Sequence, residues 1–237
     1  MRIQVIGHGR LGSRMIASLR LLGHEVIGSR SVKEVVDLAL VCVPDDAACD
    51  VIRQLGHIPH IVCTSGGIPM QALEDARNHG HGVAKLHPLQ TFTEAKLEPF
   101  EPTTHFALGG DEEVVKILVT WVEQWQGVPH HLAPEAWTTY HLAAVLAANF
   151  LPLFIRCGAE ILAKTGCDQT SALDWLAPLV RQSVSQGLDP SVARPFSGPA
   201  IRGDREMVER HVTHLGEVAP EWSTVYSLLS ELMMTRS

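Results

Sequence analysis

The sequence lacks the features that mark nucleic-acid-binding and membrane-spanning proteins. Its 237 residues carry a formal net charge of −7 and contain no run of basic residues, whereas binding to nucleic acid needs a basic surface. The N-terminus shows no long apolar segment followed by a small-residue cleavage site, so we expect no signal peptide. The most apolar stretch, 142–155, contains Asn149 and Pro152 and is expected to be too short to cross a bilayer. These absences argue against nucleic acid and membranes as partners.

The five cysteines are odd in number and scattered, and the sequence lacks a Cys-x-x-Cys pair. Cys42 and Cys63 fall inside apolar strand patterns, where a free thiol acts as a small hydrophobic side chain. This usage predicts a reducing compartment, the cytoplasm. The thirteen histidines include close pairs such as His79 and His81, but no pair comes with Cys, Asp or Glu at the spacing of metal ligands. We therefore predict no metal site.

The first half of the chain alternates short β-branched runs with helical segments. Near-continuous apolar runs are typical of parallel strands that are covered on both faces. A helix is expected at 11–22, and strands are expected at 2–6, 24–28, 38–43, 60–64, 82–86 and 105–108. This alternation predicts an α/β fold with a doubly wound Rossmann sheet.

From about Pro129 the pattern becomes helical. Helices are expected at 134–165, with a kink at Pro152, and at 168–187, 204–216 and 220–235. Asp168 and Asp204 suit helix N-termini. We therefore predict two domains, a dinucleotide-binding domain over 1–130 and an all-helical domain over 131–237.

The first strand leads into a glycine-rich loop of the pattern G-x-G-x-x-G, which opens a helix. Its residues are Gly7-His8-Gly9-Arg10-Leu11-Gly12. The first glycine permits the tight turn, the second lets the backbone approach a pyrophosphate, and the third allows close packing of helix on strand. The N–H groups and the dipole of the helix N-terminus favour phosphate. A glycine turn without a ligand is the alternative, and the strand–loop–helix context favours dinucleotide binding.

The turn after the second strand reads Ser29, Arg30 and Ser31, where an NAD enzyme usually has an acidic residue for the ribose 2′-hydroxyl. Two hydroxyls and a guanidinium suit a 2′-phosphate, so the predicted cofactor is NADP(H). A solvated turn is the alternative. Val43 and Pro44 close the third strand, where their backbone is expected to contact the cofactor. Asp45 or Asp46, which follow, is expected to be a plain helix N-cap.

Two further strands end on polar residues at the same edge of the predicted sheet. Ser65 offers a hydroxyl, beside exposed N–H groups, to a substrate carbonyl or carboxylate; a glycine turn is the alternative. His87 ends the fifth strand, where an imidazole beside a nicotinamide can exchange a proton at neutral pH. A histidine held by hydrogen bonds inside a rigid turn is the other interpretation.

Polar residues also interrupt the apolar face of the first long helix. His141 and Asn149 lie two turns apart, roughly 12 Å along the axis, so they can flank one ligand but cannot grip one atom. Satisfied polar residues of the core are the alternative. Arg202, in a turn before the expected cap Asp204, is a candidate partner for a substrate carboxylate.

These motifs resemble those of Rossmann-like proteins with the C-terminal domain of unknown function DUF2520. The matching pieces are 7–12, 28–30, 65–66, 87–92, 140–149 and 198–204. The wider relatives are the 6-phosphogluconate dehydrogenase-like reductases, including pyrroline-5-carboxylate reductase and F420-dependent NADP oxidoreductase, whose NADP-binding turn the Gly-Ser-Arg stretch resembles. The resemblance implies a reductase fold with a helical, often dimerising, second domain, and it implies no particular substrate.

The sequence departs from many β-hydroxyacid-type relatives at one position. Those relatives have a lysine four residues before the helix asparagine, where this chain has Val145. The usual proton donor of that subgroup is absent, so His141 or His87 would have to replace it.

Two functions are compatible with the sequence. The first is an NADP(H)-dependent oxidoreductase that reduces a small carbonyl or imine in the cleft between the domains, with Ser65, Asn149 and Arg202 positioning the substrate. The second is a non-catalytic NADP-binding or redox-sensing protein. We also predict a homodimer formed through the helical half, because 142–155 is apolar around most of its circumference.

Overall fold

The computed structural model describes residues 1–29 and 35–236 and divides into two compact units, Met1–Ala148 and Asn149–Ser237. The sequence placed the domain boundary after residue 130. The structure keeps 131–148 with the first unit because Trp137, in the first turn of α5 (Trp137–Ala144), is buried in that unit's core.

The first unit is built on a seven-stranded sheet of order β2-β1-β3-β4-β5-β6-β7. Its strands are β1 (Arg2–Ile6), β2 (Glu25–Ser29), β3 (Leu38–Val41), β4 (His60–Cys63), β5 (Gly82–Pro88), β6 (His105–Gly110) and β7 (Val128–His131). All neighbours pair in parallel except β5 and β6, which are antiparallel. The predicted α/β class is confirmed, and the carboxyl ends of β1 to β5 share one edge.

The strand β7 was missing from the sequence-based prediction. It is four residues long, contains Pro129 and two histidines, and pairs only with β6 at the margin of the sheet. Proline is tolerated on such an edge strand because one side of the strand makes no ladder hydrogen bonds. A strand with neither a β-branched run nor an apolar alternation gives no signal to sequence patterns.

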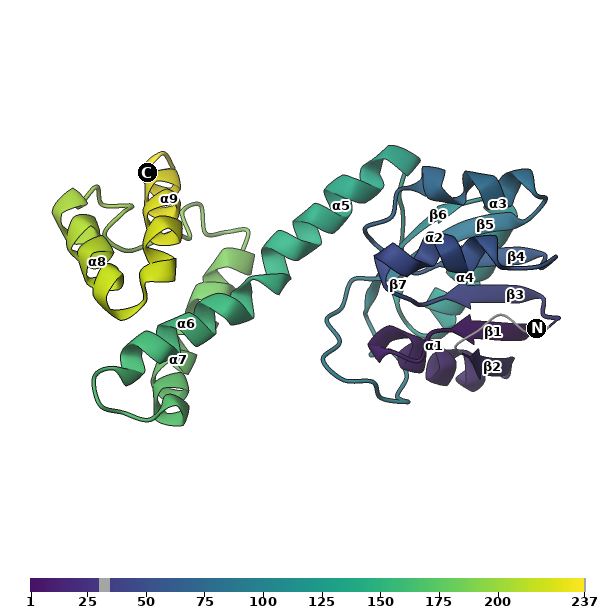
Figure 1. The fold of residues 1–237 in the computed structure, drawn as a ribbon, viewed down its shortest axis with the longest axis horizontal. Helices are drawn as coiled ribbons and strands as arrows, with labels where there is room; N and C mark the ends of the chain where they lie inside the picture. Colours follow the sequence, from purple (N-terminus) through teal and green to yellow (C-terminus); the bar gives the residue numbers. More distant parts are fainter. Residues whose placement is uncertain (30–34, 237) are drawn as a thin grey trace. The chain divides into compact units, whose positions relative to one another are not determined.

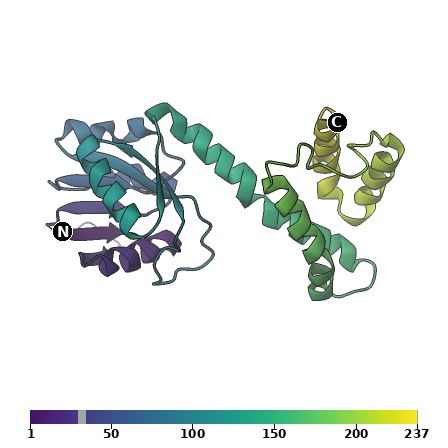
Figure 2. The same ribbon diagram turned by 180° about the vertical axis from the view of Figure 1, so that it is seen from behind.

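Helices cover both faces of the sheet (Figures 1 and 2). On one face, α1 (Arg10–Leu21) and α4 (Glu112–Gln124) bury Met15, Leu19 and Leu118 against the strands. On the other face lie α2 (Asp45–Arg53), α3 (Glu74–Asn78) and the single turn η1 (Met70–Leu73). Alternate residues of each strand therefore enter two separate cores.

The predicted long helix has a break inside it. After the turn η2 (Pro134–Ala136) and α5, one π-helical turn (η3, Val145–Asn149) leads to α6 (Leu151–Ala163). The sequence predicted a kink at Pro152, whereas the irregular turn lies before that residue, at Val145–Asn149. Pro152 lies in the first turn of α6, where a missing N–H costs little.

The second unit consists of helices. It contains α6, α7 (Gln169–Leu188), α8 (Arg205–Val218), the turn η4 (Pro220–Trp222) and α9 (Ser223–Met234). Two predicted N-caps are confirmed. Asp168 accepts hydrogen bonds from the backbone N–H groups of Thr170 and Ser171, and Asp204 accepts one from Met207. Within this unit α6 packs on α7, and α8 packs on α9.

The long helical run is both apolar and exposed. By length and composition, Pro134–Ala163 could cross a membrane: its most apolar 18-residue window has a mean hydropathy of 1.7, and 11% of that window is buried. The expectation that the apolar stretch is too short is therefore wrong, because the helical run extends beyond 142–155. Length and composition alone are weak evidence for a membrane span, since a helix that packs against protein passes the same test.

Candidate functional site

The glycine-rich loop between β1 and α1 has a geometry that only glycine allows at two positions. Gly7 has φ +107°, and a Cβ atom there would lie 2.3 Å from the carbonyl oxygen of Cys42. A Cβ atom at Gly12 would lie 1.8 Å from the carbonyl oxygen of Gly7. The first and third glycines of the motif therefore bring α1 tightly against the ends of β1 and β3.

The second glycine of the motif faces open space. Gly9 is the N-cap of α1, no atom lies within 4 Å of the position its Cβ would take, and no side chain of the described residues caps this helix. His8 and Arg10 are exposed, whereas Leu11 is half-buried against the core. An open glycine at an uncapped helix N-terminus lets a pyrophosphate approach closely. The pyrophosphate oxygens would accept hydrogen bonds from the N–H groups of the first turn.

The end of β2 closes one side of this loop. The His8 imidazole lies against the backbone of Gly28, whose Cβ would come within 2.6 Å of Nε2. Ser29 accepts a hydrogen bond from the Gln4 side chain at 2.7 Å. Arg30 and Ser31, the predicted 2′-phosphate contacts, lie outside the described residues, so that assignment stays a prediction.

The end of β3 corrects one expectation. Val43 and Pro44 follow the strand at the carboxyl edge, as predicted, and Pro44 itself occupies the N-cap position of α2. Neither Asp45 nor Asp46 is the cap. Asp45 is the first helical residue, and its carboxylate instead accepts a hydrogen bond of 2.6 Å from the Ser65 hydroxyl.

Ser65 is buried after β4 and is fully engaged within the protein. Its hydroxyl donates a hydrogen bond to the Asp45 carboxylate. The same oxygen accepts a hydrogen bond from the backbone N–H of Ile68, with an N to O distance of 3.1 Å. The hydroxyl therefore orders the loop 65–68, and its proton points to a carboxylate rather than to solvent. The substrate contact predicted for Ser65 would need this hydrogen bond to rearrange.

Two predicted histidines meet over this loop. His87 Nδ1 lies 2.8 Å from the Tyr140 hydroxyl, and the ring centroids of His87 and His141 are 6.2 Å apart at an interplanar angle of 88°. Both rings lie on Gly66, whose Cβ would be 2.7 Å from His141 Cδ2 and 2.9 Å from His87 Nε2. Glycine is therefore required at position 66. The loop after β4, the strand β5 with His87, and the helix α5 with Tyr140 and His141 together form one polar cluster.

The surroundings of His87 keep its imidazole uncharged at neutral pH. Burial, the neighbouring His141 and the ammonium of Lys85 lower the pKa of His87 to about 4. Burial also raises the pKa of Tyr140 to about 12, so its phenol keeps its proton. When Tyr140 donates to Nδ1, the imidazole N–H is on Nε2, next to Gly66. His87 can then donate a hydrogen bond, but a pKa of about 4 does not suit the proton exchange at neutral pH that the sequence analysis expected of it.

Sequence reasoning missed Lys85, Asp45 and Tyr140 as members of this cluster. Lys85 is fully buried on β5, two residues before His87. A lysine inside an apolar strand pattern was the available signal, because a buried charge needs a specific environment. The partners of Asp45 and Tyr140 are distant in the sequence and left no local pattern.

The remaining predicted site residues belong to the second unit. Asn149 is exposed at the end of η3, and Arg202 is exposed in the turn before α8. Their assignment to substrate binding stays a prediction.

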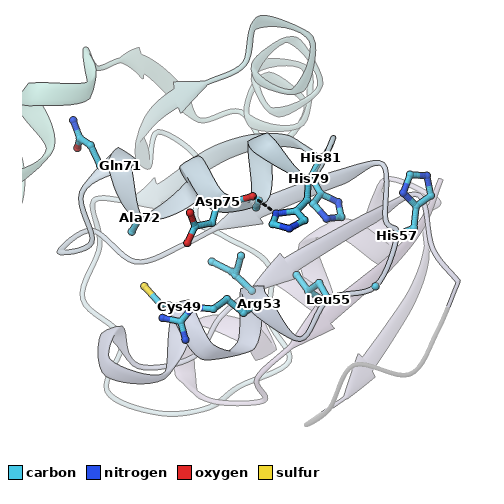
Figure 3. Close-up of a pocket in the computed structure, with 12 residues that line it drawn as sticks. Cys49, Arg53, Leu55, His57, Gln71, Ala72, Asp75, His79 and His81 are labelled. Atoms are coloured by element: carbon cyan, nitrogen blue, oxygen red, sulfur yellow. Dashed lines mark hydrogen bonds between the residues drawn. The ribbon is translucent and has the colours of Figure 1, made fainter.

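A separate groove of about 540 Å³ lies between α2 and α3 (Figure 3). His79 Nδ1 lies 2.6 Å from the backbone carbonyl of Asp75, and His81 Nδ1 lies 2.6 Å from that of Ile58. None of the predicted site residues lines this groove. Within the described ranges, no group of three or more His, Cys, Asp or Glu residues is arranged to hold a metal ion.

Both thiols near the carboxyl edge behave as predicted for small hydrophobic side chains. Burial raises the pKa of Cys42 to about 12 and that of Cys63 to about 11. Neither thiol supplies a nucleophile at neutral pH.

Comparison with known proteins supports the fold of the whole chain. The model of a family described as a domain of unknown function (DUF2520) matches residues 104–233. A comparison with curated proteins finds no match.

Three solved structures illustrate the structural likeness. A Bacteroides fragilis protein assigned as an NADP oxidoreductase shares 21% identity over 99% of this chain and 98% of its own, with a TM-score of 0.81. The 1-pyrroline-5-carboxylate reductase of Streptococcus pyogenes shares 20% over 99% and 98%, with a TM-score of 0.61. An imine reductase of Myxococcus stipitatus, solved with NADP+, shares 14% over 99% and 92%, with a TM-score of 0.65. At these identities the likeness establishes the fold.

Proposed function

The chain belongs to the DUF2520 family, and we propose that it is an NADP(H)-dependent oxidoreductase that reduces a small carbonyl or imine. One observation carries the proposal. The open Gly9 at the N-terminus of α1 lies on the same sheet edge as the cluster of His87, Tyr140 and His141. Ligands of open α/β sheets bind outside the carboxyl ends of the strands, so one bound dinucleotide would reach from the first feature toward the second. The relatives with oxidoreductase names agree with this reading.

The residues of the loop fit the proposed cofactor. Gly7 and Gly12 shape the turn, Gly9 leaves room for the pyrophosphate, and the first turn of α1 offers N–H donors. When bound, NADPH supplies a hydride. On this proposal, Ser29, Arg30 and Ser31 hold the 2′-phosphate, and Val43 and Pro44 contact the cofactor through their backbone.

The polar cluster would receive the substrate. The uncharged His87 donates a hydrogen bond to a carbonyl oxygen or imine nitrogen, with Tyr140 fixing its ring. Reduction of a carbonyl also consumes one proton, and we assign its delivery to His141, whose ring lies beside that of His87 and, like it, against Gly66. Asn149 and Arg202 are assigned to positioning the substrate.

Turnover measurements test this function. NADPH oxidation is followed with a panel of ketones, ketoacids, cyclic imines and a deazaflavin, for the wild type, His141→Gln and His131→Gln, an exposed control on β7. We expect turnover with at least one compound. We also expect a loss of roughly 100-fold or more in His141→Gln, with unchanged melting temperature and NADPH affinity. Activity in His141→Gln that falls only with the folded fraction would make His141 structural.

A non-catalytic NADP-binding protein is the second candidate. The observation in its favour is Val145, which stands where many relatives of the hydroxyacid type have a proton-donating lysine, together with a His87 that carries no proton to give as imidazolium. Tight NADPH binding without oxidation by any compound of the panel would support it.

A further inference from the structure

Lys85 is a lysine whose whole side chain is buried. It is 0% exposed and follows Ala84 on β5, with His87 two residues further on. Side chains two apart on a strand point to the same face, here the face covered by α2 and α3. Its Nζ donates a hydrogen bond to the backbone carbonyl of Ile68 and lies 3.9 Å from the ring centroid of Trp137.

Packing alone does not explain a charge in this position. Burying an ammonium group costs several kcal/mol, and an apolar side chain of similar length fills the same volume without that cost. Burial lowers the pKa of Lys85 to about 8, although neighbouring Cys63 and the Asp45 carboxylate act in the opposite direction. The group nevertheless remains mainly protonated at neutral pH, so the side chain places a positive charge behind the site.

The two partners of Lys85 belong to the two segments that frame the cluster. Ile68 ends the loop whose Ser65 is bonded to Asp45 and whose Gly66 supports both imidazoles. Trp137 lies one turn before Tyr140 in α5, and their ring centroids are 5.9 Å apart at 82°. One ammonium group therefore contacts the β4 loop and the start of α5 while it is attached to the strand that carries His87.

We propose that Lys85 is a positioning residue, whose ammonium joins the loop 65–68 to the first turn of α5 and places its positive charge next to the His87 imidazole. The charged and titratable groups around this pair are Lys85, His141, Tyr140, Asp45 and Cys63. Only the catalytic consequence of this arrangement rests on the proposed function. The protonation of His87 can be measured without any substrate.

Lys85→Met tests the proposal, because methionine keeps the length and removes the charge. The matched control is Lys116→Met, which removes an exposed ammonium on α4 that is paired with Glu112. The His87 imidazole is titrated by NMR in each protein. We expect its titration midpoint to rise by about half a pH unit or more in Lys85→Met and to stay unchanged in Lys116→Met. Lys85→Arg, which retains the charge, should titrate nearer to the wild type than Lys85→Met.

A second measurement covers the case in which Lys85→Met does not fold. In the wild type labelled with ¹³C at lysine Cε, the Lys85 signal should titrate near pH 8, well below the ordinary lysine pKa of 10.5. An identical His87 midpoint in wild type and Lys85→Met, or a Lys85 signal that titrates at the ordinary lysine pKa of 10.5, would overturn the proposal.

Turnover separates this proposal from the proposed function. If the wild type reduces a compound of the panel, Lys85→Met should lose roughly tenfold or more in kcat with NADPH affinity unchanged. If the wild type reduces nothing, the proposed function fails while the His87 titration still decides the role of Lys85.

Discussion

The two units bury their apolar side chains to very different extents. In the first unit, large side chains such as Phe106, Trp137 and Ile3 are almost completely buried. At its carboxyl edge, Ser65 is hydrogen-bonded to Asp45 and His87 to Tyr140. In the second unit, Trp175 is 64% exposed and Leu179 61% exposed, and leucines of α6 and α9 are exposed as well. The first unit buries its large apolar side chains within itself, whereas the second exposes an apolar surface of the kind that usually binds another protein.

The difference in burial suits the two units to different roles. The buried polar contacts of the first unit hold chemical groups in fixed places, which a cofactor and substrate site requires. The exposed apolar helices of the second unit fit an interface between subunits. We propose that a second copy of the chain covers them, since symmetric dimers are the commonest oligomers.

The largest expected effect is on assembly. The wild type should sediment at about twice the 25.9 kDa of the chain, and the double variant Leu153→Glu/Leu179→Glu as a monomer. Placing two carboxylates in a buried apolar interface costs about 3 kcal/mol or more. Sedimentation velocity at micromolar concentration decides this. A wild type that is monomeric, or that partitions into lipid vesicles, would contradict the dimer.

Glycine-to-alanine substitutions sharpen the contrast in packing. In the first unit, Gly12→Ala forces a Cβ against the Gly7 carbonyl oxygen and should cost about 3 kcal/mol of unfolding free energy. In the second unit, a Cβ at Gly216, inside α8, meets no atom within 4 Å. Gly216→Ala should stabilise by about 0.5–1 kcal/mol through helix propensity. Denaturant titrations measure both changes. Similar changes in unfolding free energy for the two variants would contradict the difference in packing between the units.

The preference for NADPH over NADH should depend on Arg30 of the first unit and not on an exposed arginine of the second unit. Arg30→Ala should weaken NADPH binding by roughly 1.5–3 kcal/mol and leave NADH binding nearly unchanged, because it removes a charge-assisted contact to the 2′-phosphate. Arg181→Ala, an exposed arginine on α7, is the matched control. Fluorescence titration with both cofactors checks this, and equal losses for NADPH and NADH would argue against a 2′-phosphate contact.

The last expected effect is on the pH dependence of stability. The pKa of His87 is about 4 in the folded protein against an ordinary value of 6.5, so the unfolded chain binds more protons between these two values. The unfolding free energy should therefore fall as the pH decreases from 6.5 through 4, and less steeply in His87→Gln. His211→Gln is the matched control, since His211 makes a similar contact with Tyr226 on the surface of the second unit. Equal slopes in wild type and His87→Gln would contradict the burial of His87.

Local patterns were sufficient to predict much of the fold. The glycine-rich loop, the buried strands β1 to β6 and the caps Asp168 and Asp204 each depend on residues that are close in the sequence. Sequence periodicity reports such neighbours directly. The strand β7 was missed because pairing with β6, rather than its own composition, makes it a strand.

The site could be predicted only in part, because its contacts join distant segments. Asp45 and Ser65 are 20 residues apart in the sequence, and His87 and Tyr140 are 53 apart. Single positions such as His87 stand out at a strand end, but their partners, and therefore their protonation, follow from the tertiary fold. The interpretation of Asp45 as a cap failed for the same reason.

Calorimetric titration of NADPH and NADH into the wild type and Gly9→Val tests the central claim most directly. A Cβ atom at Gly9 would meet no atom within 4 Å, so this variant should melt close to the wild type, yet its side chain would occupy the space assigned to the pyrophosphate. We predict that the wild type binds NADPH at least about tenfold more tightly than NADH, and that Gly9→Val remains folded and loses both. Equal affinity of the wild type for the two cofactors, or NADPH binding that is unchanged in a folded Gly9→Val, would contradict the account.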